Sequence, residues 1–302
     1  MAETVIRTEN LSKFYGKQRG VIALNLEVQR GEVFGFLGPN GAGKTTTIRV
    51  LLDFIRPTAG SAIVLGLDSR RFSRERCHRI GYLPGELSLY ENMTGGECLQ
   101  HFAHLRGGVD WRFVERLTTR LAFDPSHPIR TLSQGNKRKV GLIQAFMHKP
   151  ELLILDEPTN GLDPLVQLEF YRLIGEVKAE GRTVFVSSHN LPEVERVCDR
   201  VGIIRGGRLV AVENVATLKS RALRRLEIHF GAPVPREEFA NVAGVRDLRV
   251  EGSVLHCTVA GTMDALIKRA AQFEVVNIIS HEPSLEEIFL AYYNGTASGQ
   301  TQ

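Results

Sequence analysis

Short apolar runs alternate with helical patterns through the first two thirds of the chain. The runs are rich in aliphatic residues and predict strands, which are Val33 to Leu37, Ala62 to Leu65, Leu152 to Leu155, Thr183 to Ser187 and Val201 to Ile204. Strands that alternate with helices are typical of a mainly parallel sheet with helices packed on it. The pattern therefore predicts an α/β domain over residues 1–218.

Two departures from this alternation refine the first domain. Residues 94–148 lack strand signals and carry apolar residues at helical spacing, such as Cys98 and Phe102, so we expect an inserted helical subdomain there. Near the end of the domain, Gly206 and Gly207 separate two apolar runs. Two glycines between such runs predict a tight hairpin, which adds an antiparallel strand at the edge of the sheet.

A second, smaller domain is predicted over residues 219–302. Apolar and polar positions alternate between residues 226 and 230, and the elements that follow give the order strand, helix, strand, strand, helix, strand. This is the order of a ferredoxin-like α+β unit. Ser284 and Glu287 then form a capping box for a final amphipathic helix, and residues 296–302 are predicted to be disordered.

Composition places the chain among ordinary globular proteins. It has 302 residues, of which 43% are hydrophobic and 24% charged. The longest purely apolar runs, such as Leu152 to Leu155, are far shorter than the roughly 18 residues that a membrane-spanning helix needs. The four cysteines form no Cys-x-x-Cys pair, and the N-terminus carries no export leader, so we expect a reducing, cytosolic setting.

Charge does not predict nucleic acid as a partner. The net charge of +4 is small and evenly spread along the chain, so no nucleic-acid partner is expected. The densest basic run, Arg70 to Arg76, has two interpretations, a solvated face or a docking surface, and we favour the solvated face.

A glycine-rich loop follows the strand that ends at Leu37. The loop matches the pattern G-x-x-x-x-G-K-[ST] between a strand and a helix, and it consists of Gly38, Pro39, Asn40, Gly41, Ala42, Gly43, Lys44, Thr45 and Thr46. Successive backbone N–H groups in such a loop bind phosphate oxygens. Lys44 is expected to contact the β- and γ-phosphates, and Thr45 to bind Mg²⁺. A plain glycine turn would leave a buried lysine without an anion, so we predict a nucleoside triphosphate and Mg²⁺ as cofactors.

Polar groups end two further strands of the predicted parallel sheet. Asp156 and Glu157 follow four aliphatic residues, and His189 follows the strand that begins at Thr183. Open α/β sheets place their ligand chemistry at such strand ends. Asp156 is expected to hold Mg²⁺, Glu157 to orient or deprotonate the attacking water, and His189 to contact the γ-phosphate and the water.

Two aromatic residues precede the phosphate loop. Tyr15 is our choice for stacking on the base, and its neighbour Phe14 is expected in the core because Phe14 carries no polar atom. A lone aromatic residue near a strand is also common in cores, so both interpretations of Tyr15 stay open.

Five motifs in order resemble those of the ATP-binding-cassette (ABC) ATPases. They are the phosphate loop, LSQGNKRK at 132–139, LLILDEPT at 152–159, GLDP at 161–164, and SH at 188–189. The family signature is usually LSGGQ, and this chain keeps its serine and second glycine as Ser133 and Gly135. The resemblance covers residues 1 to about 215. It implies a P-loop ATPase with ATP as the nucleotide, Glu157 as the catalytic carboxylate and His189 as the switch histidine.

The resemblance also implies that two cassettes act as a pair. Ser133 and Gly135, at the start of a predicted helix, would complete the γ-phosphate site of a second chain, so that two chains enclose two ATP molecules head to tail. Asp163 would lie at the seam between them. From the residues alone, Ser133 and Asp163 are also good helix N-caps. The partner is expected to be a second copy or a paired cassette subunit.

The end of the chain resembles the extra domain of ATPase subunits of multidrug and antibiotic exporters. This resemblance rests on residues 282–290 and on the strand order. It implies a peripheral protein on the cytoplasmic face of the cell membrane that energises a separate polytopic permease. The transported compound is not predicted.

Two other functional classes compete with the exporter subunit. A soluble ABC ATPase acting on ribosomes or nucleic acid generally carries two cassettes, sustained heptads or Cys-x-x-Cys pairs, and this chain shows none of these. An unrelated phosphate-loop kinase or GTPase would explain neither residues 132–139 nor His189.

The turn Pro84-Gly85 departs from the family pattern. This segment usually carries a glutamine that touches Mg²⁺ and the attacking water, but Gly85 occupies its place here and Glu86 follows. Glu86 is either a metal ligand that a flexible Gly85 brings toward Mg²⁺ or a residue that faces the membrane partner. Both interpretations stay open.

Overall fold

The computed structural model describes residues 3–70, 78–221 and 224–281. The chain divides into two compact units, Met1–Glu213 and Asn214–Gln302, close to the boundary expected near residue 218. The predicted capping box at Ser284 and Glu287, the disordered tail and most of the basic run lie outside the described residues. Among the helices of the described ranges, none is long and apolar enough to cross a bilayer.

A six-stranded sheet forms the centre of the first unit, in the order β10-β9-β3-β8-β7-β6. Its strands are β3 (Val33–Leu37), β6 (Ile80–Leu83), β7 (Leu152–Asp156), β8 (Thr183–Ser188), β9 (Arg200–Arg205) and β10 (Arg208–Asn214). The pairs β9 with β3, β3 with β8, β8 with β7 and β7 with β6 are parallel. Every residue of β3, β7 and β8 is buried, as expected for strands covered on both faces. The carboxyl ends of β3, β8 and β7 therefore lie side by side at one buried edge of the sheet.

Helices α1 (Lys44–Leu51), α6 (Pro164–Ala179) and α7 (Leu191–Val197) follow β3, β7 and β8 in the chain. The two-glycine hairpin predicted between β9 and β10 is confirmed. Gly206 and Gly207 have φ values of 53° and 78°, the left-handed conformation that a two-residue hairpin turn requires at both central positions.

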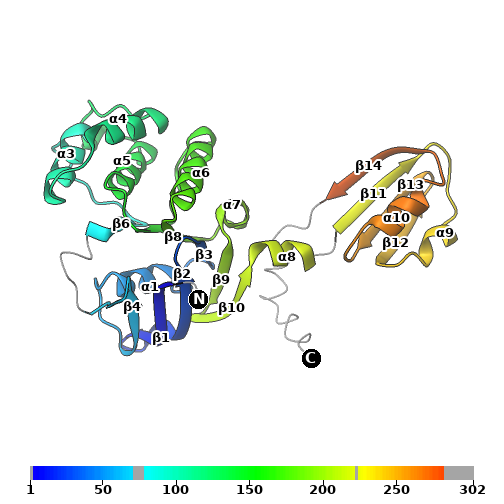
Figure 1. Cartoon of the computed structure of the whole chain (residues 1–302), viewed down its shortest axis with the longest axis horizontal. Coiled ribbons are helices and arrows are strands. Elements are labelled where there is room, and N and C mark those ends of the chain that lie inside the picture. Colours follow the sequence, from blue (N-terminus) through cyan, green and yellow to red (C-terminus); the bar gives the residue numbers. More distant parts are fainter. Residues whose placement is uncertain (1–2, 71–77, 222–223, 282–302) are drawn as a thin grey trace. The chain divides into compact units, whose positions relative to one another are not determined.

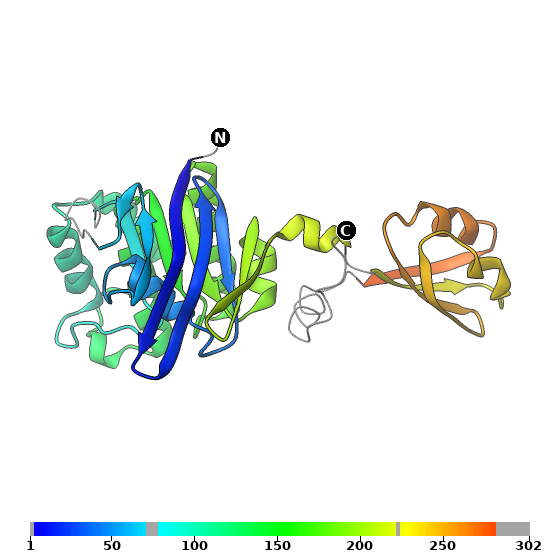
Figure 2. The same cartoon turned by 90° about the horizontal axis from the view of Figure 1, so that it is seen from below.

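A second sheet in this unit is antiparallel, with the order β2-β1-β4-β5. It consists of β1 (Thr4–Tyr15), β2 (Gln18–Gln29), β4 (Ala59–Val64) and β5 (Leu67–Asp68), and Figure 2 shows β1 and β2 as long neighbouring strands. The run Ala62 to Leu65, expected in the parallel sheet, instead pairs antiparallel with β1, so that part of the prediction is wrong. The strands β1 and β2 were not predicted. Register shifts such as the one between Thr8 and Leu11 interrupt the alternation in β1, whereas Leu24 to Gln29 of β2 alternate regularly and this signal was missed.

Residues 94–148, where a helical subdomain is expected, are mainly helical in the structure. They contain α3 (Gly95–Leu105), α4 (Trp111–Arg120), the short 3₁₀ helix η1 (Ile129–Thr131) and α5 (Gln134–Phe146), and Figure 1 shows α3, α4 and α5 grouped together. Polar N-caps begin the three α-helices. Thr94 and Glu97 form a capping box for α3, and the side chains of Asp110 and Ser133 accept hydrogen bonds from the first turns of α4 and α5.

The second unit has the predicted ferredoxin-like topology. After α8 (Val215–Arg221) it contains β11 (Arg224–Phe230), α9 (Glu237–Ala240), β12 (Val245–Glu251), β13 (Val254–Val259), α10 (Asp264–Ala270) and β14 (Val275–His281). The strands form an antiparallel sheet in the order β12-β13-β11-β14. Its core contains three phenylalanines whose ring centroids lie 5.6–6.0 Å apart, which are Phe230, Phe239 and Phe273.

Replacing Phe239 by alanine tests whether the second unit unfolds on its own. Phe239 is fully buried, so its truncation should cost this unit about 3–5 kcal/mol of unfolding free energy. The single tryptophan, Trp111, lies in α4 and reports on the first unit. In urea, Phe239→Ala should shift part of the circular-dichroism transition and leave the Trp111 fluorescence midpoint unchanged.

Phe185→Ala is the matched control, because Phe185 is equally buried in β8 of the first unit. This variant should shift the fluorescence midpoint instead. A common shift of both signals in either variant would show that the two units unfold as one.

Candidate nucleotide-binding and catalytic site

The glycine-rich loop lies between β3 and α1 with its backbone packed against neighbouring segments. Gly41 and Gly43 have φ values of 78° and 110°. A Cβ atom on Gly43 would lie 2.5 Å from the carbonyl oxygen of Gly20, and one on Gly38 would lie 2.4 Å from that of Ile204. Space thus excludes a side chain at Gly38 and Gly43, and the left-handed conformation of Gly41 and Gly43 is one that glycine adopts without strain.

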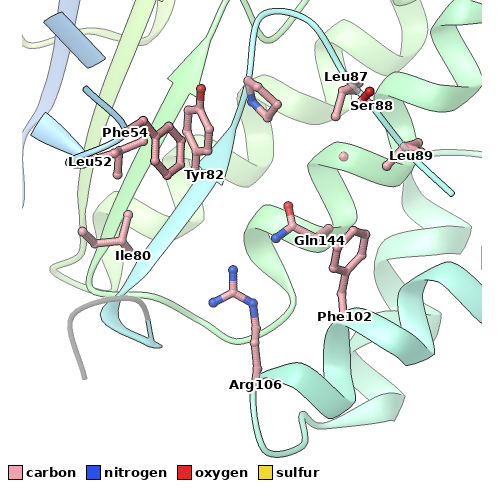
Figure 3. Close-up of a pocket in the computed structure, with 12 residues that line it drawn as sticks. Leu52, Phe54, Ile80, Tyr82, Leu87, Ser88, Leu89, Phe102, Arg106 and Gln144 are labelled. Carbon is pink, nitrogen blue, oxygen red and sulfur yellow. The ribbon is translucent and has the colours of Figure 1, made fainter. Parts of the chain in front are cut away.

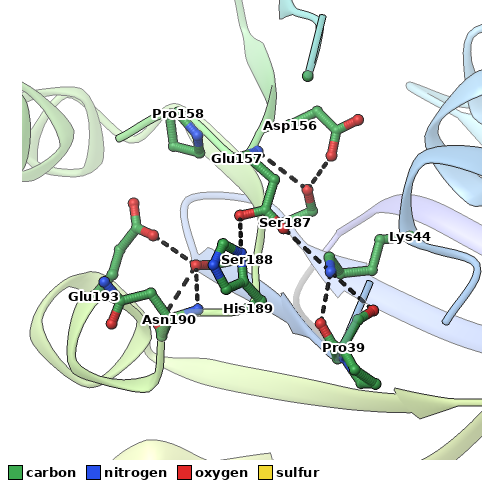
Figure 4. A network of polar contacts seen from close by, with 12 residues as sticks. Pro39, Lys44, Asp156, Glu157, Pro158, Ser187, Ser188, His189, Asn190 and Glu193 are labelled. Atoms are coloured by element: carbon green, nitrogen blue, oxygen red, sulfur yellow. Dashed lines mark hydrogen bonds and ion pairs between the residues drawn. The ribbon is translucent and has the colours of Figure 1, made fainter. Parts of the chain in front are cut away.

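The Lys44 ammonium is buried at the start of α1, where its side chain is only 6% exposed. Its Nζ donates to the carbonyl oxygens of Gly38 at 2.6 Å and Pro39 at 3.2 Å, and lies 3.1 Å from Oε1 of Glu157 (Figure 4). Two of the three N–H donors of the ammonium group therefore bind carbonyl oxygens, whereas Glu157 Oε1 forms an ion pair with Lys44 and accepts no hydrogen bond from the described residues. A phosphate oxygen that binds Lys44 would compete with Glu157 Oε1 for this charge.

Asp156, at the end of β7, is fully buried beside Thr45. Its Oδ2 accepts a hydrogen bond of 2.8 Å from the Thr45 hydroxyl, and its Oδ1 accepts one from the Ser187 hydroxyl. The structure thus brings together the two residues predicted to bind Mg²⁺. Carboxylate and hydroxyl oxygens are the hard ligands that this ion prefers, so the donor set fits it.

Glu157 lies between Lys44 and His189. Its second carboxylate oxygen, Oε2, is 2.8 Å from Nδ1 of His189, whose side chain is 46% exposed (Figure 4). The Glu157 backbone has a φ of 50°, a left-handed conformation that costs a non-glycine residue on the order of 1–3 kcal/mol. Its N–H donates to the Ser187 carbonyl oxygen at 3.1 Å. The carboxylate predicted to act on water is therefore held between a cation and an imidazole.

A cavity of about 390 Å³ lies over the loop. It is lined by Tyr15, Gln18, Arg19, Gly20, Pro39, Asn40, Gly41, Gly43, Lys44, Thr45, Thr46, Arg49 and Glu157. Tyr15 is 45% exposed at its rim, where an aromatic ring can stack on a base. The expectation that Phe14 lies in the core is wrong, because its side chain is 36% exposed. Strand β4 pairs with β1 only as far as Ser12. The end of the β1–β2 hairpin that carries Phe14 therefore extends beyond β4.

The predicted signature residues lie away from this cavity. Ser133 caps α5 and accepts a 3.2 Å hydrogen bond from the Asn136 N–H, and Asp163 caps α6 in the same way through Val166 at 3.0 Å. A Cβ atom on Gly135 would lie 2.5 Å from the carbonyl oxygen of Gly161. Ser133, Gly135 and Asp163 do not contribute to the lining of the cavity in the chain described here.

Gly85 and Glu86, which follow β6, lie in different surroundings. A Cβ atom on Gly85 would lie 3.1 Å from Oδ2 of Asp156, so the turn after β6 passes close to the carboxylate that is predicted to hold Mg²⁺. Glu86 is exposed and lines a second cavity of about 320 Å³ together with Gln134 and Asn160. The structure does not place the Glu86 side chain in the cavity over the phosphate loop.

Sequence reasoning missed a buried carboxyl group behind His189. Glu193 in α7 is 1% exposed, and its Oε2 accepts a 2.6 Å hydrogen bond from Ser188 (Figure 4). Burial raises the Glu193 pKa to about 7, although hydrogen bonds from Ser188 and Thr159 lower it. Its sequence context, an acidic residue in the first turn of a helix, is that of an ordinary exposed carboxylate and carries no signal of burial.

Known proteins resemble this chain along nearly its whole length. A family model described as ABC transporter matches residues 21–160. The bacitracin transport ATP-binding protein BcrA of Bacillus licheniformis is 35% identical over 305 residues, which cover 98% of this chain and 99% of that protein. The chain belongs to the ABC transporter family. The linearmycin resistance ATP-binding protein LnrL of Bacillus subtilis strain 168 is 32% identical to this chain over 303 residues, which cover 95% of this chain and 97% of LnrL.

Solved structures agree with this assignment. The ATP-binding subunit of an ABC transporter, at 31% identity, superposes with a TM-score of 0.65 over 72% of this chain and 92% of that chain. A dimeric cassette, MJ0796, in a post-hydrolysis state with ADP and phosphate has a TM-score of 0.63 over 70% of this chain and 98% of its own. At 19% identity it bears on the fold alone. The predicted fold class, family and ATPase activity are confirmed, and an unrelated kinase or GTPase is excluded.

The pKa of Glu193 predicts a pH-dependent stability. Because the folded-state pKa of about 7 exceeds the ordinary value of 4.5, the protonated carboxyl favours folding at low pH, and this contribution is lost as the pH rises through 7. Glu193→Gln cannot lose a proton. Between pH 5 and pH 8 the unfolding free energy of this variant should therefore rise relative to the wild type by about 3 kcal/mol.

Urea unfolding at several pH values measures this difference. Glu195→Gln, two residues along the same helix, controls for the loss of one negative charge and should show no such trend. A constant difference between Glu193→Gln and the wild type over this pH range would contradict the assigned protonation of Glu193.

Proposed function

We propose that this chain is the ATP-hydrolysing subunit of a membrane exporter and works as a head-to-tail pair of cassettes. One observation carries the proposal. The cavity over the phosphate loop contains the lysine and the catalytic carboxylate, whereas Ser133 and the start of α5 lie outside it. A second chain whose Ser133 faces this cavity would add the missing hydroxyl and helix N-terminus to the γ-phosphate site.

Each residue of the site has a role in this proposal. The loop amides and Lys44 bind the phosphates, and the Tyr15 ring stacks on adenine. Thr45 and Asp156 hold Mg²⁺, which when bound neutralises charge on the phosphate oxygens. Glu157 accepts a proton from the attacking water or orients it, and His189 holds the Glu157 carboxylate through Oε2.

Binding and catalysis are linked through Lys44. A γ-phosphate that pairs with Lys44 competes for the ammonium with Glu157 Oε1, which lies 3.1 Å away. Occupation of the site would thus release this carboxylate oxygen for the water. ATP binding would drive the two chains together, and hydrolysis would separate them.

The names of the relatives support export. BcrA is a bacitracin transport protein and LnrL a linearmycin resistance protein, and each is matched over nearly its full length. We therefore place the protein at the cytoplasmic face of the cell membrane, bound to a separate polytopic permease. Residues 1–218 form the nucleotide-binding domain and residues 219–302 an accessory domain. The alternative of a soluble ATPase acting on ribosomes or nucleic acid predicts stimulation of hydrolysis by RNA or DNA.

An apolar cavity of about 280 Å³ supplies a contact site for the permease (Figure 3). Residues from β6 and the segment after it, from the segment that follows α1 and from the helical subdomain surround it, including Phe54, Tyr82, Leu87 and Phe102. Phe54 is 57% exposed. A short amphipathic helix of the permease, inserting apolar side chains, fits this lining. Glu86 is exposed next to Leu87, which favours the partner-facing role over metal binding.

Glu157→Gln tests the paired-cassette mechanism. This variant keeps the contact geometry but cannot accept a proton, so hydrolysis should slow about 100-fold or more while ATP still binds. With ATP and Mg²⁺ it should elute as a dimer in size-exclusion chromatography with light scattering.

Ser133→Arg added to Glu157→Gln should abolish this dimer, because the signature serine would meet the ATP of the partner. Ser126→Arg, an exposed serine elsewhere in the helical subdomain, is the matched control and should leave the dimer intact. If Glu157→Gln stays monomeric with ATP, the head-to-tail mechanism is wrong for the isolated subunit.

Phe54→Asp tests the permease site. A carboxylate in an apolar contact should weaken the complex at least about tenfold, or about 1.4 kcal/mol, while the ATPase rate of the isolated chain stays within about twofold. The yield of permease that co-purifies from membranes with the tagged chain measures the loss. Val210→Asp on β10, at the opposite edge of the sheet from β6 and also exposed, is the control. Equal yields from both variants would place the permease elsewhere.

A further inference from the structure

Arg138 is a buried cation in the helix that follows the signature. It lies in α5, and it is only 4% exposed. Its guanidinium group donates to the backbone carbonyl oxygens of two segments, residues 84–85 and 156–158. The acceptors are Pro84 and Gly85, each at 2.8 Å, Asp156 at 2.7 Å, Glu157, and Pro158 at 3.4 Å. Five acceptors thus match the five N–H donors of the side chain.

The Arg138 cation lies near two carboxylates, although its hydrogen bonds go to backbone oxygens. Burial lowers the Arg138 pKa, and the nearby charges of Asp156 and Glu157 raise it. The cation is therefore attracted to the catalytic carboxylates while it binds the backbone that carries them. A lysine could not replace these contacts, because an ammonium group has three N–H donors and no planar fork.

These hydrogen bonds act on the strained part of the catalytic segment. Glu157 has a left-handed backbone, and such a conformation persists only where its surroundings determine it. On the amino side, the Glu157 N–H binds the Ser187 carbonyl oxygen. On the carboxyl side, Arg138 binds the carbonyl oxygens of Glu157 and Pro158. The direction of the Glu157 side chain toward Lys44 and His189 thus depends on both contacts.

The same guanidinium group reaches the turn after β6. One nitrogen, Nη1, binds the carbonyl oxygens of Pro84 and Gly85, and the other, Nη2, binds those of Asp156 and Glu157. Because the guanidinium group is planar and rigid, the turn and the catalytic segment keep a fixed spacing.

We propose that Arg138 is a positioning residue that fixes the backbone of Glu157 and joins it to the turn at Pro84 and Gly85. This inference rests on the proposed role of Glu157 as the catalytic carboxylate. Loss of the guanidinium group leaves five carbonyl oxygens without these donors and releases the catalytic segment from the turn. Arg138 donates no hydrogen bond to the phosphate loop itself, and the bonds from Lys44 to the carbonyl oxygens of Gly38 and Pro39 lie within that loop.

Arg138→Gln should lower kcat about 10- to 100-fold, the effect of misplacing a catalytic group by about 1 Å, with the KM for ATP changed less than about threefold. Arg138→Lys keeps the charge and should lie between this variant and the wild type. Lys137→Gln, the adjacent and partly exposed cation on the same helix, is the matched control and should keep its kcat within about twofold. Steady-state hydrolysis of ATP with Mg²⁺ by the full chain measures all three.

A double-mutant comparison separates positioning from general damage. In a Glu157→Gln background the carboxylate to be positioned is absent, so Arg138→Gln should cost less than about threefold further. An equal loss in both backgrounds, or a kcat within twofold of the wild type for Arg138→Gln, would overturn the proposal. If Glu157→Gln alone hydrolyses ATP normally, the proposed role of Glu157 fails instead. Should Arg138→Gln not fold, Arg138→Lys supports the same comparison.

Hydrogen exchange tests the link to the turn. The N–H groups of residues 85–87 and of residues 156, 157 and 159 should exchange faster together in Arg138→Gln and Arg138→Lys, and neither segment should change in Lys137→Gln. Faster exchange in only one of the two segments would show that Arg138 does not join them.

Discussion

The burial of the Lys44 charge is the constraint on which the site depends. An ammonium group removed from water must be paired and hydrogen-bonded, or the cost of its desolvation is prohibitive. The chain meets this need with two loop carbonyls and the carboxylate of Glu157. These partners come from the ends of β3 and β7, which are separated in the sheet by β8. The parallel sheet is thus required to bring residues more than a hundred positions apart to a single cation.

Prediction from the sequence succeeds where side chains mark their own environment. The strand before Gly38, the run of aliphatic residues before Asp156 and the N-cap at Ser133 are local patterns, and the structure has the predicted elements at each. The roles assigned to these residues remain proposals, because they concern ligands. Bulges break the alternation along β1 and hide this strand from the sequence pattern, whereas the regular alternation of Leu24 to Val28 in β2 was a signal that the prediction missed.

Arg138 and Glu193 were missed for a different reason. The partners of Arg138 are backbone carbonyls between 18 and 54 residues away, and a carbonyl oxygen is present at every position whatever the residue. Glu193 is buried by the packing of α7 near the end of β8, a property of the assembled unit. Both residues look like ordinary surface charges until the fold places them, so no local pattern could have distinguished them.

The backbone contact between Gly135 and Gly161 has a mechanical consequence. The two segments approach so closely that even a methyl group would not fit between them. One segment begins the helix that Ser133 caps, and the other immediately precedes Asp163, which caps α6. Ser133 and Asp163, the two residues proposed to meet a second cassette, therefore lie on two segments whose backbones pack directly against each other. Docking of a partner here would therefore remove little conformational entropy from these two segments.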